Sequence, residues 1–356
     1  MDELIKSPSE LTFVLPNGTK SHTFPSGSGG IEEAPDDGAW YSRVSKSWRR
    51  IPAPISETGR SWKVNTATGL PTNQWNAVTF GNGVFVAVSR TGSGNRAATS
   101  TNGINWTTRQ TPSNEEWGDV IYANSLFVAM AKPMNQFQEP AIMTSPDGVT
   151  WTLQNTTPAP FYLSTIAYGA GLFVALAANG TDPQFITSPD ASTWTLRSGI
   201  PIRPSAVIYE NGLFVAVGGQ GTGSATQKIA TSTDGLTWTA RTVPSAISGN
   251  LGSVAYINGL FIATSGTNLI TSTDGATWTL RSVLPMSAHG NMIKANGILV
   301  GNNGTDVSPG LRISTSIDGV NWDFHHLEFS NYLRQMAYGN GLFVIVTGWS
   351  DVITSA

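Results

Sequence analysis

The sequence predicts an all-β protein: a seven-bladed β-propeller in which an N-terminal strand closes the last blade. Two observations carry this prediction. A tryptophan recurs at intervals of about 40 to 45 residues, the period of a four-stranded propeller blade. The last copy of the repeat lacks its fourth strand, and a matching segment stands before the first complete copy. The tryptophans of the six complete copies are Trp106, Trp151, Trp194, Trp238, Trp278 and Trp322.

Each copy of the repeat contains four expected strands. A short run ends in an aromatic residue, as in NAVTF, and a turn such as GNG follows it. An apolar run such as LFVAV then leads through a variable loop to a segment like IATSTDG, which precedes TWT. The second strand is apolar at nearly every position, so both of its faces should be buried between stacked sheets.

The turn between the third and fourth strands has its own chemistry. In STDGATW, residues 272–278, the Ser and Asp side chains can accept hydrogen bonds from nearby backbone amides, and Gly275 can adopt a positive φ. We expect Trp278 to lie back over the blade edge and bury a large apolar area there. The equivalent turns contain Asn102/Gly103, Asp147/Gly148, Asp190/Ala191, Asp234/Gly235 and Asp318/Gly319.

These turns resemble the Asp-box of sialidase-like and related propellers, although they are one residue shorter than the usual form. The resemblance covers the chain from about Ser56 onward. It implies that the turns are structural and lie on the face away from any catalytic site.

The C-terminus supplies three strands of a seventh blade, in QMAYGNGLFVIVTGWSDVITSA. Residues 56–71, SETGRSWKVNTATGLP, align with residues 272–285, which places Trp62 on Trp278. We therefore expect one blade to combine three C-terminal strands with one N-terminal strand. Such a ring cannot open without breaking a strand pair.

The repeat divides the chain into a propeller at residues 56–356 and a separate segment at residues 1–55. The separate segment is expected to be an extended arm with a flexible Gly/Ser linker at residues 27–30. A small β-hairpin is expected at residues 34–52, and a hairpin of this size needs a partner surface for stability.

This hairpin sequence, EAPDDGAWYSRVSKSWRRIPAP, resembles a short segment that recurs in tail fibres and other virion appendage proteins of tailed bacteriophages. The resemblance implies that residues 1–55 attach the protein to other virion proteins, and that the protein is a homo-oligomer in the virion. The matching residues are Ala34, Pro35, Asp37, Gly38, Tyr41, Arg43, Trp48 and Ile51.

Composition excludes several classes of function. The net charge is −3 and 12% of the residues are charged, without a basic cluster, so we expect no nucleic-acid partner. No apolar run is long enough for a signal peptide or a membrane span, so we expect synthesis in a host cytoplasm and no membrane insertion. There is no cysteine, and His325 and His326 should point to opposite faces of a strand. We expect neither a metal nor a cofactor.

Catalytic interpretations are weaker. The string RRIP at residues 49–52 resembles a sialidase motif, but it falls inside the predicted hairpin, and the sialidase set of three arginines, a Tyr/Glu pair and an Asp is not evident. Glu115, Glu116 and Asp119 are expected to form a solvated rim. We therefore expect a protein that is not an enzyme. The arginines that recur after the repeat tryptophan, and so belong to the blade pattern, are Arg109, Arg197, Arg241 and Arg281.

Binding is expected on one face of the ring. The loops between the second and third strands, and between successive blades, vary in length and chemistry, and on a propeller they emerge on the same face. Their polar residues and occasional aromatics suit a sugar or protein surface. The candidate ligand-binding residues are Arg96, Gln136, Phe137, Gln138, Glu139, Asp182, Gln220, Tyr332, Trp349 and Asp351.

The leading hypothesis is a bacteriophage virion protein of the tail-fibre or appendage type, which is located in the virion and recognises a glycan or protein of the host surface. A sialidase-like glycan hydrolase or depolymerase is the first alternative. A non-viral propeller that acts as an assembly factor is the second.

Overall fold

The computed structural model describes residues 13–14, 40–44, 47–51, 61–132, 140–154, 163–177, 183–220, 227–283, 291–303 and 310–355. The chain divides into two compact units, Met1–Ser56 and Glu57–Ala356. Every element in the described residues is a β-strand, and no helix among them offers a candidate for a membrane span.

The first unit contains one antiparallel sheet with the strand order β1-β2-β3. Its strands are β1 (Phe13–Val14), β2 (Trp40–Val44) and β3 (Ser47–Ile51). Strands β2 and β3 form the hairpin that the sequence places within residues 34–52. Tyr41, Arg43 and Trp48 lie on this hairpin, whereas Pro35, Asp37 and Gly38 lie outside the described residues.

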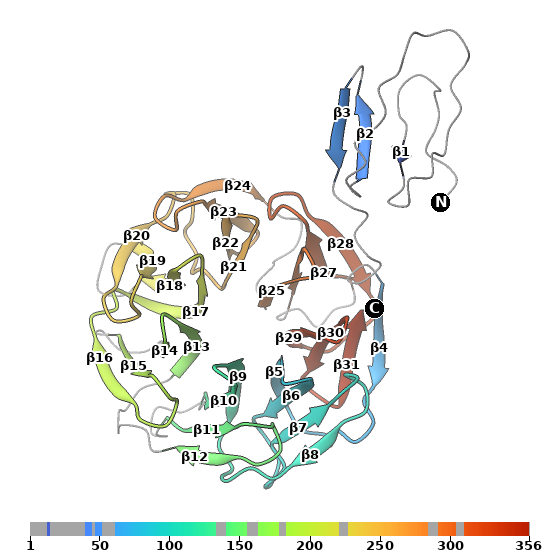
Figure 1. Ribbon diagram of the computed structural model, residues 1–356, viewed down its shortest axis with the longest axis vertical. Helices are drawn as coiled ribbons and strands as arrows, with labels where there is room; N and C mark the ends of the chain where they lie inside the picture. Colours follow the sequence, from blue (N-terminus) through green and yellow to red (C-terminus); the bar gives the residue numbers. More distant parts are fainter. Residues whose placement is uncertain are drawn as a thin grey trace. The chain divides into compact units, whose positions relative to one another are not determined.

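The described residues of the second unit form seven four-stranded antiparallel blades around an axis, as the sequence predicts (Figure 1). Blades 1 to 3 contain β5 (Trp75–Gly81), β6 (Val84–Ser89), β7 (Ala97–Ser100), β8 (Thr107–Arg109), β9 (Trp117–Ala123), β10 (Leu126–Ala131), β11 (Ile142–Ser145), β12 (Thr152–Gln154), β13 (Leu163–Gly169), β14 (Leu172–Ala177), β15 (Gln184–Ser188) and β16 (Thr195–Ser198). Blades 4 to 6 contain β17 (Ile202–Glu210), β18 (Leu213–Gln220), β19 (Gln227–Ser232), β20 (Thr239–Thr242), β21 (Ser253–Ile257), β22 (Leu260–Ser265), β23 (Asn268–Ser272), β24 (Thr279–Val283), β25 (Asn291–Ala295), β26 (Ile298–Asn302), β27 (Gly310–Ser316) and β28 (Asp323–Leu327).

Blade 7 joins the two ends of the propeller sequence. It consists of β29 (Leu333–Gly339), β30 (Leu342–Thr347), β31 (Asp351–Ser355) and β4 (Trp62–Thr66), in that order. The β31–β4 ladder is antiparallel and runs from Asp351 opposite Thr66 to Ser355 opposite Trp62. The predicted closure by an N-terminal strand is therefore confirmed.

The core lies between neighbouring blades. The second strand of each blade is buried on both faces, as its uninterrupted apolar sequence predicts. Blades approach closely where glycine ends the first strand. A Cβ at Gly169 would overlap the ring of Tyr209 in the next blade, and Gly81 and Gly339 have the same relation to Tyr122 and Phe80.

The turns that contain the repeated Asp form the expected local hydrogen bonds. In blade 5 the Asp274 Oδ1 atom accepts hydrogen bonds from the backbone amides of Ala276 and Thr277, each at 2.8 Å. The Trp278 Nε1 atom donates to the Gly275 carbonyl oxygen at 2.9 Å, and Gly275 has a φ of 70°. These amide donors lower the pKa of Asp274 to about 2.

The repeated arginines are structural. The Nε atom of Arg241 in β20 donates to the Thr231 Oγ1 atom in β19 at 3.0 Å, so it links the two outer strands of its blade. Arg109, Arg197 and Arg281 make the same bond to the threonines of their own blades. The interpretation of these arginines as part of the blade pattern is confirmed.

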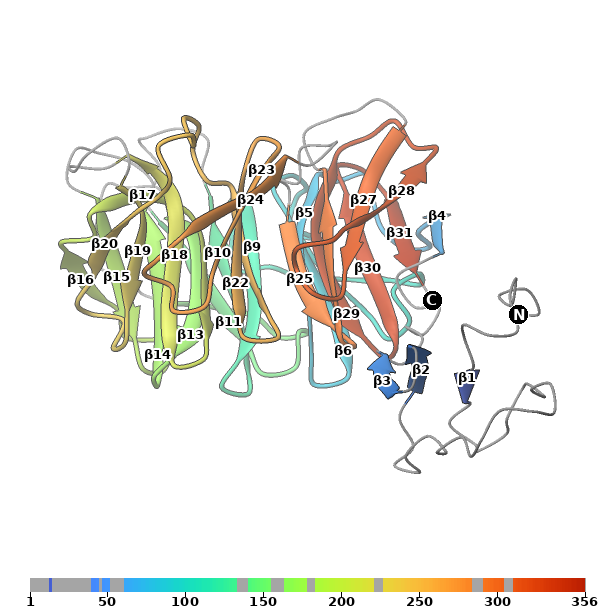
Figure 2. The same cartoon turned by 90° about the horizontal axis from the view of Figure 1, so that it is seen from above.

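The two ends of the ring differ in character. The first turn of one blade contacts the Asp-containing turn of the next, as when Asn340 Nδ2 donates to the Thr101 carbonyl oxygen at 3.0 Å. We call this end the turn face. The variable loops open at the opposite end, which we call the loop face, and Figure 2 shows the strands running between the two.

Candidate functional site

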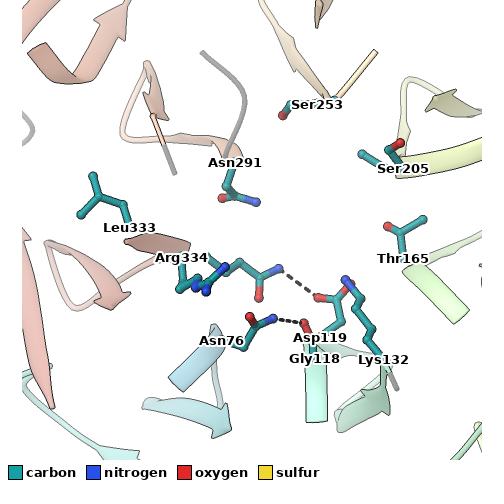
Figure 3. Close-up of a pocket in the computed structure, with 13 residues that line it drawn as sticks. Asn76, Gly118, Asp119, Lys132, Thr165, Ser205, Ser253, Asn291, Leu333 and Arg334 are labelled. Atoms are coloured by element: carbon teal, nitrogen blue, oxygen red, sulfur yellow. Dashed lines mark hydrogen bonds and ion pairs between the residues drawn. The ribbon is translucent and has the colours of Figure 1, made fainter. Parts of the chain in front are cut away.

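A cavity of about 320 Å³ lies on the axis at the loop-face end of the innermost strands. All seven blades contribute to its wall, and most of the lining side chains are polar. Figure 3 shows several of these side chains arranged around one central space. The lining residues are Asn76, Gly118, Asp119, Lys132, Thr165, Ser205, Ala206, Gly252, Ser253, Asn291, Leu333, Arg334 and Gln335.

β-Bulges place several of these residues. The innermost strand of five blades carries one extra residue near its beginning, which shifts the register against the second strand. A bulge bends the strand and re-aims the side chains beside it. Asn76, Gly118 and Ser205 are bulged residues of this kind, and in blade 7 Arg334 and Gln335 together stand opposite a single residue of β30.

Two of the bulged residues also tie their blade to the next one. The Asn76 Nδ2 atom donates to the Gly118 carbonyl oxygen at 2.7 Å, and Ser164 Oγ donates to the Pro204 carbonyl oxygen at 2.9 Å. These bonds cross from one blade to its neighbour, so the cavity wall is already formed without a ligand. A preformed wall lowers the cost of ordering side chains on binding.

Asp119 is a buried carboxylate in this wall, with 5% of its surface exposed. Its Oδ1 atom accepts hydrogen bonds from Gln335 Nε2 and from the Val120 amide, both at 3.0 Å. Its Oδ2 atom lies 3.3 Å from Lys132 Nζ. The expectation that Asp119 belongs to a solvated rim is wrong, because the innermost strand β9 turns this side chain toward the axis. There Lys132 compensates its charge and Gln335 donates a hydrogen bond to it.

Arg334 lines the same cavity and is partly buried. Its guanidinium carbon lies 5.1 Å from the centre of the Tyr332 ring. Burial lowers the pKa of Arg334, and the nearby charge of Arg90 adds to this effect. Among the described residues, no hydrogen-bond acceptor or carboxylate pairs with the Arg334 guanidinium.

Three sequence-predicted residues come together on blade 7. Tyr332 precedes β29, and Trp349 lies in the loop between β30 and β31. The Gly348 amide donates to the Tyr332 carbonyl oxygen at 3.2 Å, so these two segments touch. Both aromatic side chains are exposed, Tyr332 by 44% and Trp349 by 49%. Asp351 begins β31 at the same edge, where its carbonyl oxygen accepts a hydrogen bond from Thr347.

Backbone carbonyl oxygens hold the side chain of Arg96. Its Nε atom donates to the Gly92 carbonyl oxygen at 2.9 Å, and its Nη1 atom donates to the carbonyl oxygens of Arg90 and Glu115, each at 2.8 Å. These bonds join two loops of the loop face and use the Nε and Nη1 donors of the guanidinium.

The remaining candidates are described in part or not at all. Gln220 ends β18 opposite Ile202, and only its backbone is described. Residues 136–139 and Asp182 lie outside the described residues.

None of the described residues that the sequence suggested for ligand binding lines the cavity, although a signal was present. One column of the repeat alignment lies four residues before the residue, usually aromatic, that ends the first apolar run of each blade. That column contains Asn76, Gly118, Ser164, Ser205, Gly252, Gly290 and Arg334. A single charged residue among small and polar ones marks Arg334 as a departure from the blade pattern.

Metal binding has no support from the described residues, which contain no group of three or more His, Asp or Glu side chains arranged to hold an ion. His325 lies 2.9 Å from Thr315 Oγ1, the position that arginine occupies in other blades.

No protein-family model and no curated protein matches the sequence. Solved propeller structures are similar to this one in fold. YCF48 from Cyanidioschyzon merolae aligns with a TM-score of 0.60 and 13% identity over 83% of this chain and 98% of that chain. A second structure, of YCF48 bound to D1 peptide, aligns with a TM-score of 0.60 and 14% identity over 83% and 94% of the two chains.

The comparison extends to an enzyme. A catalytically inactive variant of virginiamycin B lyase from Staphylococcus aureus, with quinupristin, aligns with a TM-score of 0.65 and 11% identity over 83% of this chain and 99% of that chain. The shared property is the fold. At these identities one fold serves a lyase and a peptide-binding protein, so the site must decide the function.

Proposed function

We propose that this protein is a non-enzymatic recognition module whose loop face binds a glycan or protein of a host cell surface. One observation carries the proposal: a preformed polar cavity on the axis is lined by Arg334, and the exposed ring of Tyr332 lies against the guanidinium of this residue. The loop that carries the exposed Trp349 contacts the Tyr332 backbone. Aromatic rings offer flat apolar surfaces, and the surrounding amides and hydroxyls offer hydrogen bonds. Ligand sites combine these two properties.

The chemistry of the cavity favours binding over hydrolysis. Glycoside hydrolysis ordinarily requires two carboxyl groups that flank the bond to be cleaved. Asp119 is the one carboxylate among the described lining residues, and Lys132 and Gln335 hold it. A carboxylate compensated in this way is a poor general acid or base. A sialidase-like hydrolase therefore finds less support in this cavity than a binding protein.

The proposal extends to a virion. The sequence of residues 34–52 resembles a segment of bacteriophage tail fibres and appendages, and it folds here around the β2–β3 hairpin. In the proposal, residues 1–55 bind other virion proteins, copies of the chain assemble as a homo-oligomer, and the propeller faces the host. Synthesis takes place in the host cytoplasm before assembly.

Peptide recognition by a non-viral propeller is a second candidate. It is favoured by one comparison, since YCF48 has been solved with D1 peptide bound and has a fold similar to this one. In this candidate, a peptide segment of a partner protein occupies the loop face.

Adsorption of the full-length chain tests the proposal. A fluorescently labelled chain is applied to host cells and to a glycan array, and the variant Tyr332→Ala/Trp349→Ala is compared with wild type. Removal of both exposed rings should weaken binding about tenfold or more, because stacked aromatics dominate such contacts. A matched control is Leu236→Ala, which removes an exposed apolar side chain from the turn face.

The outcomes separate the candidates. Loss of binding in the double variant and not in the control supports the loop face as the binding surface. Adsorption equal to wild type in the double variant contradicts it. Release of reducing sugar ends from a bound glycan would show hydrolysis, and it would favour the hydrolase over the non-enzymatic binding module.

A further inference from the structure

The positive charge of Arg334 is not neutralised by any described residue. It lines the axial cavity, it is partly buried, and no described carboxylate or hydrogen-bond acceptor pairs with its guanidinium. A partly buried charge without a partner costs free energy. A bound ligand of opposite charge would recover that cost.

The carboxylates near Arg334 already have cationic partners, which leaves Arg334 available for an anionic ligand. Asp119 is paired with Lys132, and the Glu116 Oε2 atom lies 3.8 Å from Arg90 Nε. Arg90 Nη2 also donates to the Lys132 carbonyl oxygen at 2.8 Å, which holds the Arg90 side chain beside the cavity. With both carboxylates paired, the charge of Arg334 is left over. The closeness of Arg90 makes the positive field at Arg334 stronger still.

Arg334 is also held in place. The Tyr332 ring lies against the guanidinium at 5.1 Å, and the Arg334 carbonyl oxygen accepts a hydrogen bond from Asn302 Nδ2 at 2.8 Å. Stacking on an aromatic face limits the motion of the guanidinium and leaves its N–H groups available in the plane. A planar, preorganised fork of donors suits a carboxylate or a phosphate.

The remaining surroundings match a sugar. Asn291 Oδ1 is a buried acceptor with no partner among the described residues, and Asn291 lines the cavity. A ligand hydroxyl would supply the missing donor. The exposed Tyr332 ring lies against Arg334 of the cavity wall, and the exposed Trp349 lies on the loop that contacts the Tyr332 backbone. The C–H face of a pyranose can pack against such rings.

We propose that the axial cavity binds an anionic saccharide, with Arg334 holding a carboxylate or phosphate substituent, Asn291 accepting a hydroxyl, and Tyr332 and Trp349 supporting the sugar ring. This inference rests on the proposed glycan-binding function and names the class of glycan.

Titration of the full-length chain with three probes tests the inference. The probes are an oligosaccharide of glucuronic acid, the same oligosaccharide after reduction of its carboxyl groups, and a neutral oligosaccharide carrying one phosphate. Wild type should bind the carboxylated or the phosphorylated probe at least about tenfold more tightly than the reduced one, which is the range of a charge-assisted contact. The preferred probe identifies which anion the site takes.

Variants assign the effect to Arg334. Arg334→Gln should abolish the preference for the charged probe, and Arg334→Lys should retain part of it, because the charge remains without the planar fork. Lys294→Gln is the matched control. Lys294 is an exposed axial cation on a neighbouring stretch of the channel and does not line this cavity. Thermal melting of each variant establishes that it is folded.

Each of the other outcomes contradicts a specific part of the inference or of the proposed function. Equal binding of the charged and reduced probes, unchanged in Arg334→Gln, overturns the anion site and leaves glycan recognition standing. If the protein binds an acidic peptide through Arg334 and binds no saccharide, the ligand is not a saccharide. This outcome favours peptide recognition. Failure of the anionic probes to bind, while other glycans adsorb on the array, overturns the inference alone. Failure of every glycan overturns both.

Discussion

Trp62 stands opposite Ser355 in the ladder between β4 and β31, so the beginning and the end of the propeller share one sheet. The Trp62 ring also lies 5.9 Å from the Phe343 ring in β30. Blade 7 therefore depends on a strand from the far end of the sequence. Its ladder links the two ends of the ring by backbone hydrogen bonds.

The closure predicts a large effect of removing β4. Deletion of residues 56–64 should lower the thermal unfolding midpoint, because the β31 edge and the apolar face under Trp62 become exposed. Trp62→Ala should destabilise by about 2 to 4 kcal/mol, through loss of buried aromatic area. Differential scanning calorimetry measures both, and an unchanged midpoint in the deletion would mean that the ring does not depend on this strand.

The turn aspartates predict an acid-sensitive component of stability. The pKa values of Asp234 and Asp274 are lowered to about 2 from an ordinary 3.8. A lowered folded-state pKa means that the carboxylate contributes stability above about pH 4, and that this contribution is lost as the pH falls toward 2. Thermal melts between pH 2 and pH 6 should show this decline.

Blade 1 provides the matching control for the carboxylates. Asn102 Oδ1 accepts from the Ile104 and Asn105 amides at 3.0 and 2.8 Å, so a neutral amide can hold the same turn. The double variant Asp234→Asn/Asp274→Asn should therefore fold and should decline less steeply with acid than wild type. An equal slope in the two proteins would assign the acid sensitivity to other groups.

The close approach of blades 3 and 4 predicts a steric effect. Gly169→Ala places a Cβ where the Tyr209 ring lies, so we expect a destabilisation of about 1 to 3 kcal/mol. Tyr209→Ala removes the obstacle but also loses packing. In a double-mutant cycle measured by chemical denaturation, the alanine at position 169 should cost much less in the Tyr209→Ala background. Additive effects would show that the ring does not cause the cost.

The repeated arginines predict stability effects without loss of binding. Arg241→Ala should cost about 0.5 to 1.5 kcal/mol, because Thr231 loses its donor. Arg241→Gln should be tolerated, since Gln154 Nε2 already donates to Thr144 Oγ1 at 2.7 Å in blade 2. Urea denaturation measures the two variants, and adsorption to host cells should stay at the wild-type level. Reduced adsorption by a stable Arg241→Gln variant would contradict a purely structural role.

Much of the fold could be predicted because each blade repeats its own local rules. The apolar second strand, the Asp-containing turn and the tryptophan after it all depend on residues within a few positions of each other. The aligned segments around Trp62 and Trp278 were enough to predict the seventh blade, because a ring must pair its last edge. Tyr332 and Trp349 could be proposed for binding from loop variability alone.

The cavity could not be predicted in the same way. Asp119 reads in sequence as one of three neighbouring acids, and its burial follows from the register of β9 and from Gln335, which reaches it from blade 7. The sequence suggests that Arg96 is available for a ligand, yet its Nε and Nη1 atoms donate to three backbone carbonyl oxygens from two loops. Such contacts join segments that only the closed ring brings together.

The sequence by itself determined the blade, the number of blades and the closure, since these follow from a period, a turn chemistry and a pairing rule that act locally. The tertiary structure alone decided which side chains meet on the axis and which charge is left unpaired there. The physical reason is that β-bulges in five blades and hydrogen bonds between blades set the direction of side chains on the innermost strands. Arg334 becomes a candidate binding residue only when all seven blades are in place.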